Sequence, residues 1–234
     1  MKTVLKIIFS FFLLSFVIIG CGQKEETKPA DSANQSAKTT TASPEKGSYG
    51  VKSGIVTFEN VIMEGMNQTF YFDDYGKKEA RYTLMEMEMF GQKIRTGSVE
   101  INADGYLINY DIEKKEGTKT KSFGSIGGAK DIPADLNNMT KELLERYNMK
   151  DLGTKEILGK TCKGIEMTAM GMVTEVWVWN GIMLYSKVQM SKDAKPMEIK
   201  ASKIETDVAI PAEKFQVPAD VKIKEVTDPM KMGQ

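Results

Sequence analysis

The sequence predicts a mainly β (α+β) fold: a strongly bent antiparallel sheet or incomplete barrel of about nine or ten strands with one or two helices. Short segments rich in β-branched and aromatic residues alternate with turn-forming residues, as in residues 68–72 before the acidic, glycine-containing turn 73–76. One segment, from about Ala134 to Met149, has apolar residues at helical spacing. Many short consecutive strands with few helices favour a curved sheet, sandwich or open barrel.

The strand candidates are separated by short turns. They cover residues 50–61, 68–72, 80–90, 99–101, 106–112, 163–170, 172–179, 182–190 and 197–204. Residues 103–105 and 179–181 contain Asp-Gly and Asn-Gly, which are typical of tight hairpin turns. Residues 113–120 are polar and are interpreted as a turn region. The apolar stripe of the expected helix consists of Leu136, Met139, Leu143, Leu144 and Tyr147.

The first twenty residues have the pattern of an export signal. Two lysines precede a run from Ile7 to Ile19 that is apolar except for two serines. A helix needs about 20 apolar residues to span a bilayer, so this run is too short to serve as one. It ends in Gly20-Cys21, as a cleaved signal peptide would. Residues 18–21 resemble the lipobox of bacterial lipoproteins, which implies cleavage before Cys21 and lipidation of its sulfur by acyl chains such as palmitate; a plain signal with an incidental cysteine is the alternative.

The composition changes at about residue 50. The preceding segment is poor in apolar residues and rich in Lys, Glu, Ser and Thr, so it cannot bury enough surface to order itself. We therefore expect four parts: a lipoprotein signal peptide at 1–20, a lipid-anchored flexible linker at 21–49, a β domain at 50–228 and a polar tail at 229–234. Extended as a coil, the linker reaches roughly 30 Å, which lets the domain stand off the membrane.

Composition excludes several classes of function. The chain has no histidine, which removes Ser-His-Asp and Cys-His catalytic machinery and histidine-based zinc sites. The formal charge is zero and becomes slightly negative when the signal leaves, so nucleic acid is not an expected partner. With Cys21 lipidated, Cys162 has no cysteine to pair with and is expected to be buried and inert, the alternative being a reactive thiol. We expect no enzyme activity, no cofactor and no metal, and catalysis by paired carboxylates is the remaining enzyme class.

Methionine is unusually common, with sixteen in the chain. Met85, Met87 and Met89 alternate, so on a strand they share one face with Arg81 and Thr83. Three interpretations are open: core packing, a soft apolar wall for an acyl chain or similar ligand, or a thioether site for Cu(I).

Two tryptophans share one face of another strand candidate. Trp177 and Trp179 alternate with Val176 and Val178, so a strand here is apolar on both faces and must be covered on both sides. Core packing and the lining of a cavity are both open. The glycine-rich segment 123–130 lacks the spacing of a phosphate-binding loop and is interpreted as a loop before the helix.

The C-terminal half carries a recognisable series of motifs. Residues 157–164, with the sequence Ile-Leu-Gly-Lys-Thr-Cys-Lys-Gly, are followed by Val-Trp-Val-Trp at 176–179 and by Ala-Ile-Pro-Ala-Glu-Lys-Phe at 209–215. Together with residues 69–79, they resemble the LolA/LolB-like superfamily of envelope proteins and its lipoprotein relatives, over roughly residues 50–226. The resemblance implies a bent, incomplete barrel with a helical lid and, in some members, acyl chains on the concave face.

A second resemblance concerns location. Gln23-Lys24-Glu25-Glu26 is similar to the surface-export signal of some Bacteroidetes lipoproteins and is equally typical of a charged linker. We expect a lipid-anchored protein of the cell envelope, at the outer membrane, on its periplasmic face or at the cell surface.

Taken with the lipobox, the resemblance favours a non-catalytic binding module for an acyl chain or other hydrophobic ligand. The residues expected to line its cavity are Met85, Met87, Met89, Trp177 and Trp179. A structural or interaction lipoprotein with a filled core is the first alternative, and a carboxylate-based enzyme is the second.

Overall fold

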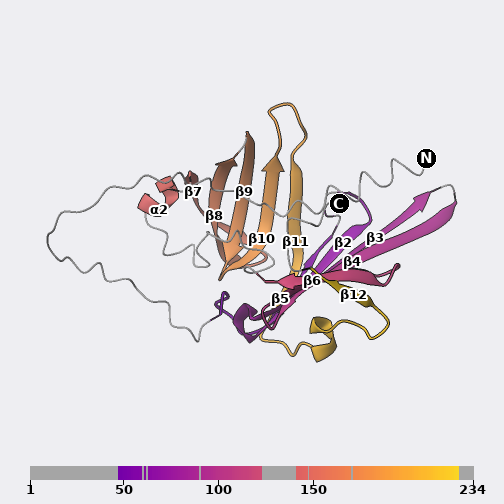
Figure 1. Ribbon diagram of the computed structural model, residues 1–234. Helices are drawn as coiled ribbons and strands as arrows, with labels where there is room; N and C mark the ends of the chain where they lie inside the picture. The colour runs from indigo at the N-terminus through magenta and orange to yellow at the C-terminus, as the bar shows by residue number, and fades with distance from the viewer. Residues whose placement is uncertain are drawn as a thin grey trace, which may run out of the picture. The chain divides into compact units, whose positions relative to one another are not determined.

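The described part of the chain is built almost entirely from strands (Figure 1). The computed structural model describes residues 47–59, 61, 63–89, 91–122, 141–146, 148–169 and 171–226, all in one structural unit. The predicted signal peptide, lipid anchor and polar tail, the glycine-rich segment and the start of the expected helix lie outside these residues.

Twelve strands form one open, curved sheet. They are β1 (Gly54–Phe58), β2 (Met66–Asp73), β3 (Lys78–Met89), β4 (Gln92–Ala103), β5 (Tyr106–Asp111), β6 (Glu116–Lys121), β7 (Met149–Ile157), β8 (Lys160–Ala169), β9 (Met172–Trp179), β10 (Ile182–Gln189), β11 (Met197–Thr206) and β12 (Lys222–Glu225). Their order across the sheet is β12-β6-β5-β4-β3-β2-β1-β11-β10-β9-β8-β7. Neighbours are antiparallel, except that β12 runs parallel to β6. The predicted fold class is confirmed, with more strands than expected.

The helical elements among the described residues are short. They are the 3₁₀ turns η2 (Asp74–Gly76) and η4 (Ala212–Phe215) and the helix α2 (Lys141–Arg146). The prediction that the helix continues to Met149 is wrong, because Met149 begins β7. Asn148 lies between them with φ of 52°, a left-handed conformation that ends helices and that asparagine tolerates better than most residues.

Three strands were not predicted. The polar segment 113–120 was interpreted as a turn, but residues 116–121 form β6 and pair with β5 on one side and with β12 on the other. The other two strands that were not predicted, β7 and β12, are the edge strands of the sheet. The predicted hairpin turns are confirmed, since Asp104-Gly105 and Asn180-Gly181 both have two successive positive φ angles, as a type I′ turn requires.

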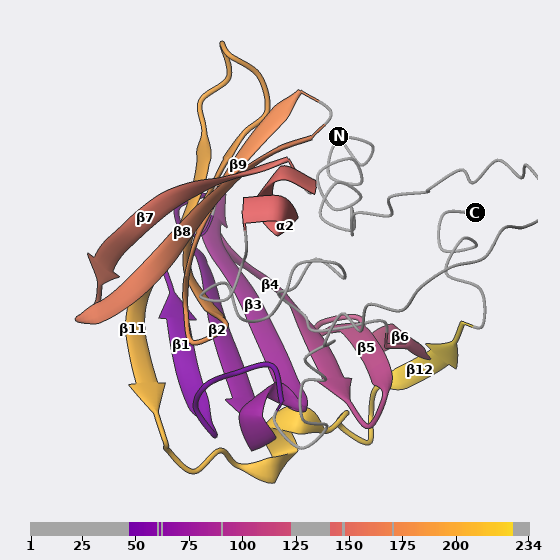
Figure 2. The same cartoon turned by 90° about the vertical axis from the view of Figure 1, so that its left-hand side faces the viewer.

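The sheet bends where the strand register shifts. The pairing of β1 with β11 skips Ser202, whose hydroxyl donates to the Thr57 carbonyl oxygen over 3.2 Å. A second shift in β10, around Leu184, separates its pairing with β9 into two parts. Such bulges increase the twist of a sheet locally. Strands β7–β10 consequently stand at a steep angle to β2–β5 (Figures 1 and 2).

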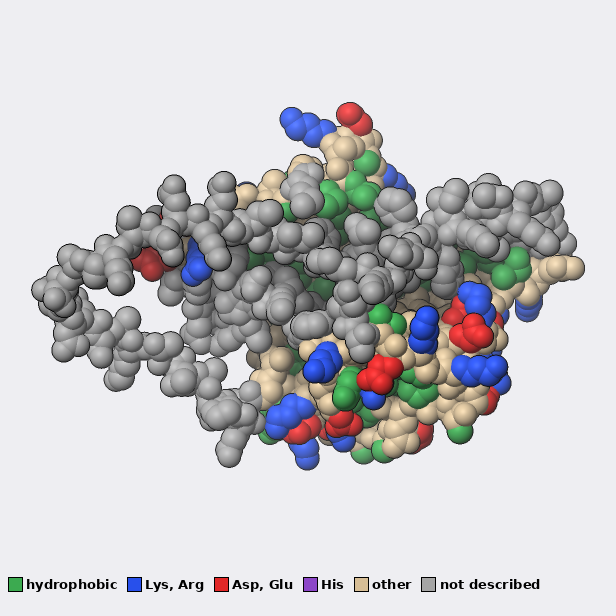
Figure 3. All heavy atoms as spheres, in the orientation of Figure 1, with side chains coloured by type: hydrophobic (Ala, Val, Ile, Leu, Met, Phe, Trp, Pro, Cys, Tyr) green, Lys and Arg blue, Asp and Glu red, His purple; other side chains and the backbone are tan. Residues whose placement is uncertain are grey.

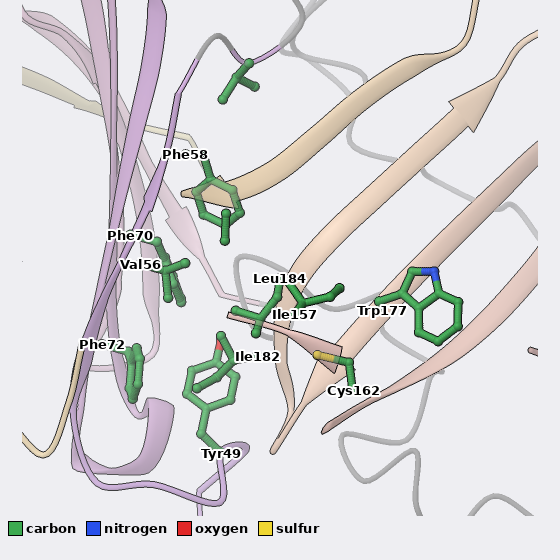
Figure 4. Packing of buried hydrophobic residues seen from close by; sticks show 12 residues of the cluster. Tyr49, Val56, Phe58, Phe70, Phe72, Ile157, Cys162, Trp177, Ile182 and Leu184 are labelled. Atoms are coloured by element: carbon green, nitrogen blue, oxygen red, sulfur yellow. The ribbon is translucent and has the colours of Figure 1, made fainter. Parts of the chain in front are cut away.

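The largest apolar cluster fills the angle between these two groups of strands. In Figure 4, Phe58, Phe70 and Phe72 point from β1 and β2 toward Leu184 and its neighbours. We call the face of β2 and β3 on the side of Phe70 and Phe72 the inner face. The buried members are Tyr49, Val56, Phe58, Val61, Phe70, Phe72, Ile157, Cys162, Trp177, Ile182, Leu184 and Ala201.

Tyr49 extends the ordered domain beyond its expected start at residue 50. Its side chain is buried and packs edge-on against Phe72, with ring centroids 5.0 Å apart. A truncated domain should therefore begin before Tyr49.

Two smaller clusters lie on the opposite face. One is formed by β3–β5 and is covered by residues from the C-terminal segment, including Phe215 and Ile223. The other lies on β8 and β9, where Leu144 of α2 packs with Val176 and Val178. The prediction that the Trp177 segment is covered on both faces is confirmed, because Trp177 belongs to the inner cluster and its valine neighbours to this one.

Candidate binding face

The inner face of β2 and β3 changes character along its length. Residues directly opposite each other in antiparallel strands share a face. The successive inner pairs are Phe72–Glu79, Phe70–Arg81, Gln68–Thr83 and Met66–Met85, and Met87 follows two residues after Met85. The face therefore runs from buried aromatic and charged residues to half-buried methionines.

A polar network occupies the inner end of this face. Glu79 has no exposed surface; Tyr49 Oη donates to one of its carboxylate oxygens and Asn102 Nδ2 to the other, the latter over 3.0 Å. Next to it, Arg81 lies 3.6 Å from the Glu100 carboxylate and over the Phe70 ring, 5.8 Å from its centroid. Buried charge is tolerated when it is hydrogen-bonded and paired in this way.

Two acids on this face, Glu79 and Glu100, meet one requirement of the carboxylate-enzyme alternative. Burial raises the pKa of Glu100 and the nearby Glu79 raises it further, while Arg81 lowers it. A catalytic acid must reach a substrate, however, and both oxygens of the buried Glu79 are already bonded. The geometry fits a structural network better than a pair of catalytic groups.

Methionine gathers at one end of the sheet. The described residues include eleven methionines, and ten lie toward the end at which β3 passes into β4; the exception is Met183. One row across the other half of the sheet runs Met149–Met167–Thr174–Val188–Met197. The second group is Met63, Met66, Met85, Met87 and Met89. We call the end of the sheet at which β3 passes into β4 the methionine end.

The fully buried core of the described part contains no methionine. Seventeen hydrophobic residues are buried, and they are aromatic, branched aliphatic, alanine or cysteine. Methionine is ordinarily among the residues most often buried. Met63 and Met190 are instead 37% and 46% exposed, and Ile94, which pairs with Met87, is 39% exposed. The methionines therefore lie at the margins of the core, where Met66 and Met183 pack against the largest cluster and Met149 and Met167 against the one around Ile165.

The sequence-predicted cavity residues fall in two places. Met85 and Met87 lie together on the inner face of β3, and Met89 is the last residue of that strand. Trp177 and Trp179 lie on β9, separated from β3 by four intervening strands. The lining of one cavity by all five stays a prediction. Met66 was not predicted to belong to this group, although alternation along β2 through Phe70 and Phe72 places it on their face.

Trp177 is held within the core. Its side chain is 7% exposed, and a Cβ at Gly164 would come within 2.7 Å of its ring. Only glycine leaves room for the indole to lie against β8 at this position. Trp177 Nε1 donates to Glu175 Oε1 over 2.5 Å, and Lys155 Nζ lies 5.4 Å from the ring centroid.

Two pockets lie away from the methionine end. One of about 380 Å³ is lined by residues at the end of β7 and the following turn together with Tyr185, Glu198 and Lys200. Burial, followed by the charges of Glu198 and Glu175, raises the pKa of Tyr185 to about 12. The other, of about 150 Å³, lies near η4 and Asp104. The lining of neither pocket includes the predicted methionines or tryptophans.

Charge is mixed on the surface. Figure 3 shows basic and acidic side chains interspersed on the visible face of the described part. Across the outer side of the β3–β4 hairpin, Arg95 pairs with Glu86 at 3.3 Å. Within the described residues, no helix is long and apolar enough to cross a membrane, and no three His, Cys, Asp or Glu side chains gather as a metal site would require.

Cys162 is expected to be inert to thiol reagents while the protein is folded. Its side chain has no exposed surface, its Sγ donates to the Lys160 carbonyl oxygen over 3.5 Å, and burial raises the pKa of the thiol. Reaction of the native protein with an aromatic disulfide at pH 8 should be at least about 100-fold slower than that of the urea-unfolded protein. Equal rates would contradict the buried position.

Comparisons with known proteins find similar structures at low sequence identity. No protein-family profile and no curated protein matches the chain. An uncharacterised conserved protein from Thermus thermophilus aligns with a TM-score of 0.50 and 9% identity, over 76% of this chain and 92% of that one. The MucA/MucB complex of Pseudomonas aeruginosa aligns with a TM-score of 0.40 and 12% identity, over 74% and 57%.

A third structure aligns with a lower score. A domain from Vibrio parahaemolyticus, described as an outer membrane lipoprotein-sorting protein domain, aligns with a TM-score of 0.27 and 12% identity, over 70% of this chain and 88% of that one. At these identities the likeness concerns the fold alone, and the chain shares its curved sheet with the Thermus protein.

Proposed function

We propose that the protein is a lipid-anchored, non-catalytic binding module of the cell envelope, and that it holds an acyl chain or other hydrophobic ligand against its methionine end. The observation that carries the proposal is the separation of residue types. Methionine is absent from the fully buried core of the described part and is partly buried, at the margin of that core, on the inner face of β2 and β3. A surface that only had to fill a core would have no reason to exclude methionine from its buried positions.

The physical properties of methionine suit this role. Its side chain is unbranched, has three rotatable bonds and carries a polarisable sulfur, so it repacks around differently shaped partners at low cost. Met66, Met85 and Met87 form a continuous strip on one face, and Ile94 of β4 extends it. The polar side chains of Gln68 and Thr83, joined by a 3.1 Å hydrogen bond, separate this strip from the charged network around Arg81. A ligand with an apolar body and a polar end matches that order.

The anchoring part of the proposal rests on the sequence. The lipobox at residues 18–21 would attach acyl chains to Cys21, and the following linker would give the domain freedom to approach ligands near the membrane. The lack of histidine in the chain, and the bonded state of Glu79, support a role without catalysis.

A fluorescent fatty acid tests the proposal. We expect the full mature chain carrying Cys21→Ser to bind it, and Met87→Asp to weaken binding at least about tenfold, because a carboxylate would lie against the apolar ligand. Since Met87 is not fully buried and a carboxylate there can reach water, the thermal midpoint of Met87→Asp should stay within a few degrees of the parent.

Leu158→Asp is the matched control, since Leu158 is 42% exposed at the opposite end of the sheet. Loss of binding in that variant alone would move the ligand to the pocket beside β7. A parent protein that binds no apolar probe would overturn the proposal and favour a structural lipoprotein with a filled core.

A further inference from the structure

Three methionines are neighbours on the inner face at the methionine end. Met66 and Met85 lie directly opposite each other in the β2–β3 ladder, and Met87 is the next residue of β3 on that face. Directly opposed residues have Cβ atoms about 5 Å apart, and the diagonal neighbour is about 7 Å away. Methionine has three rotatable bonds beyond its backbone, enough to bring three sulfurs at these spacings around one point.

The surrounding backbone fixes one side of this cluster. The loop before β2 turns tightly, with Val61 N–H donating to the Met66 carbonyl oxygen over 2.7 Å. Gly65 then lies against β3, where its carbonyl oxygen accepts from Glu86 N–H over 3.0 Å, and a Cβ at Gly65 would come within 2.1 Å of the Glu86 carbonyl oxygen. Met66 is therefore held beside Met85, and the exposed Met63 lies in the same hydrogen-bonded loop.

We propose that Met66, Met85 and Met87 form a binding site for Cu(I). Thioethers are soft, uncharged ligands that select Cu(I) over hard ions such as Ca²⁺ and Mg²⁺, which require oxygen. The sequence favours no metal at Met85 and Met87, because no cysteine or histidine is adjacent to them. The third ligand comes from another strand, and the sequence does not show that contact.

A second group of methionines provides the control for the site. Met149 and Met167 also face each other, in the β7–β8 ladder, and they pack with Ile165 and Leu144 in an apolar cluster. Met172 of β9 lies diagonal to Met167 on the same face, so this group also has three thioethers at the same end of the sheet. Replacing its facing pair, Met149 and Met167, tests whether any group of facing methionines would hold the metal.

The experiment uses the full mature chain with Cys21→Ser, under anaerobic conditions, and measures Cu(I) transfer from a coloured chelator of known affinity. We expect one Cu(I) per chain. The triple variant Met66→Leu, Met85→Leu, Met87→Leu should lose at least about 100-fold in affinity, since leucine keeps the apolar volume but has no lone pair to donate. The control Met149→Leu, Met167→Leu should bind as the parent does.

Three results would overturn the proposal: no Cu(I) bound by the parent, unchanged affinity in the triple leucine variant, or an equal loss in the control pair. Thermal melts of each variant check that folding is retained, and Ag(I), which is not redox-active here, should follow the same order. The test is independent of the proposed hydrophobic ligand. Leucine preserves the apolar strip, so the triple variant should still bind the fluorescent fatty acid even when it no longer holds the metal.

Discussion

Phe72→Ala should lower the free energy of unfolding by about 3–5 kcal/mol, the range for truncating a fully buried phenylalanine. Phe72 has no exposed surface and stacks with Phe70 at a centroid distance of 6.0 Å. It also lies over Gly54, where a Cβ would come within 2.6 Å of its ring. A glycine has no side chain that could move into the space left by the ring, so we expect a loss in the upper part of this range.

The control for this measurement is Met87→Ala on the same sheet. Met87 is only partly buried, and its truncation should cost about 2 kcal/mol or less, because part of its area stays in contact with water. Urea unfolding of the two variants, with equal m-values, gives the difference directly. Equal losses in both would mean that the methionine end is packed as firmly as the core, and would contradict the separation of the two residue types.

Cys21→Ser should move the protein from the membrane fraction to the soluble fraction almost completely. The lipobox resemblance implies that acyl chains are attached to the Cys21 sulfur, and a serine hydroxyl would not replace it. Each buried methylene contributes about 0.8 kcal/mol to membrane binding, so two or three chains hold a protein firmly and none leaves it free. Cell fractionation and labelling with a palmitate analogue measure both effects.

Cys162→Ser is the control for cysteine loss, since Cys162 is buried in the β domain. That variant should remain at the membrane and take up the label. A Cys21→Ser protein that stays membrane-bound, together with a parent that takes no label, would show that residues 18–21 are not a lipobox.

The strands predicted from the sequence are those with a strong two-residue alternation. β9 was placed at Met172–Trp179 with both ends correct, because its tryptophans and valines alternate between two apolar clusters. The turns at Asp104 and Asn180 were predicted as well, because Asp-Gly and Asn-Gly are the residue pairs that most readily adopt two successive positive φ angles.

The three missed strands lack such a local signal. β6, Glu-Gly-Thr-Lys-Thr-Lys, contains no large apolar side chain, and it is a strand because β5 and β12 bond to it. β7 carries a bulge at Leu152, and β12 has four residues and pairs in parallel with a distant segment. Their structure depends on partners far away in the sequence, which local patterns do not contain.

The candidate site was predicted in part for the same reason. Alternation in β3 correctly placed Arg81, Met85 and Met87 on one face. It did not indicate that Met66 stands opposite Met85, or that Glu100 pairs with Arg81, because both contacts depend on the register between strands. The expected grouping with Trp177 came from the shared apolar character of the residues, and the strand order places β9 far along the sheet from β3.

The pairing of β1 with β11 has a consequence for the order of folding. Gly54 near the start of the domain pairs with Thr206 near its end, and this ladder joins the two halves of the sheet. Contacts between such distant residues form slowly, because a long loop must close before they contribute. The hairpins on each side can form early. The large apolar cluster between β1–β2 and β10 can form only after β11 has paired with β1. A chain synthesised from its N-terminus therefore stays open until nearly all of it has been made, which is the state required for threading through a membrane pore.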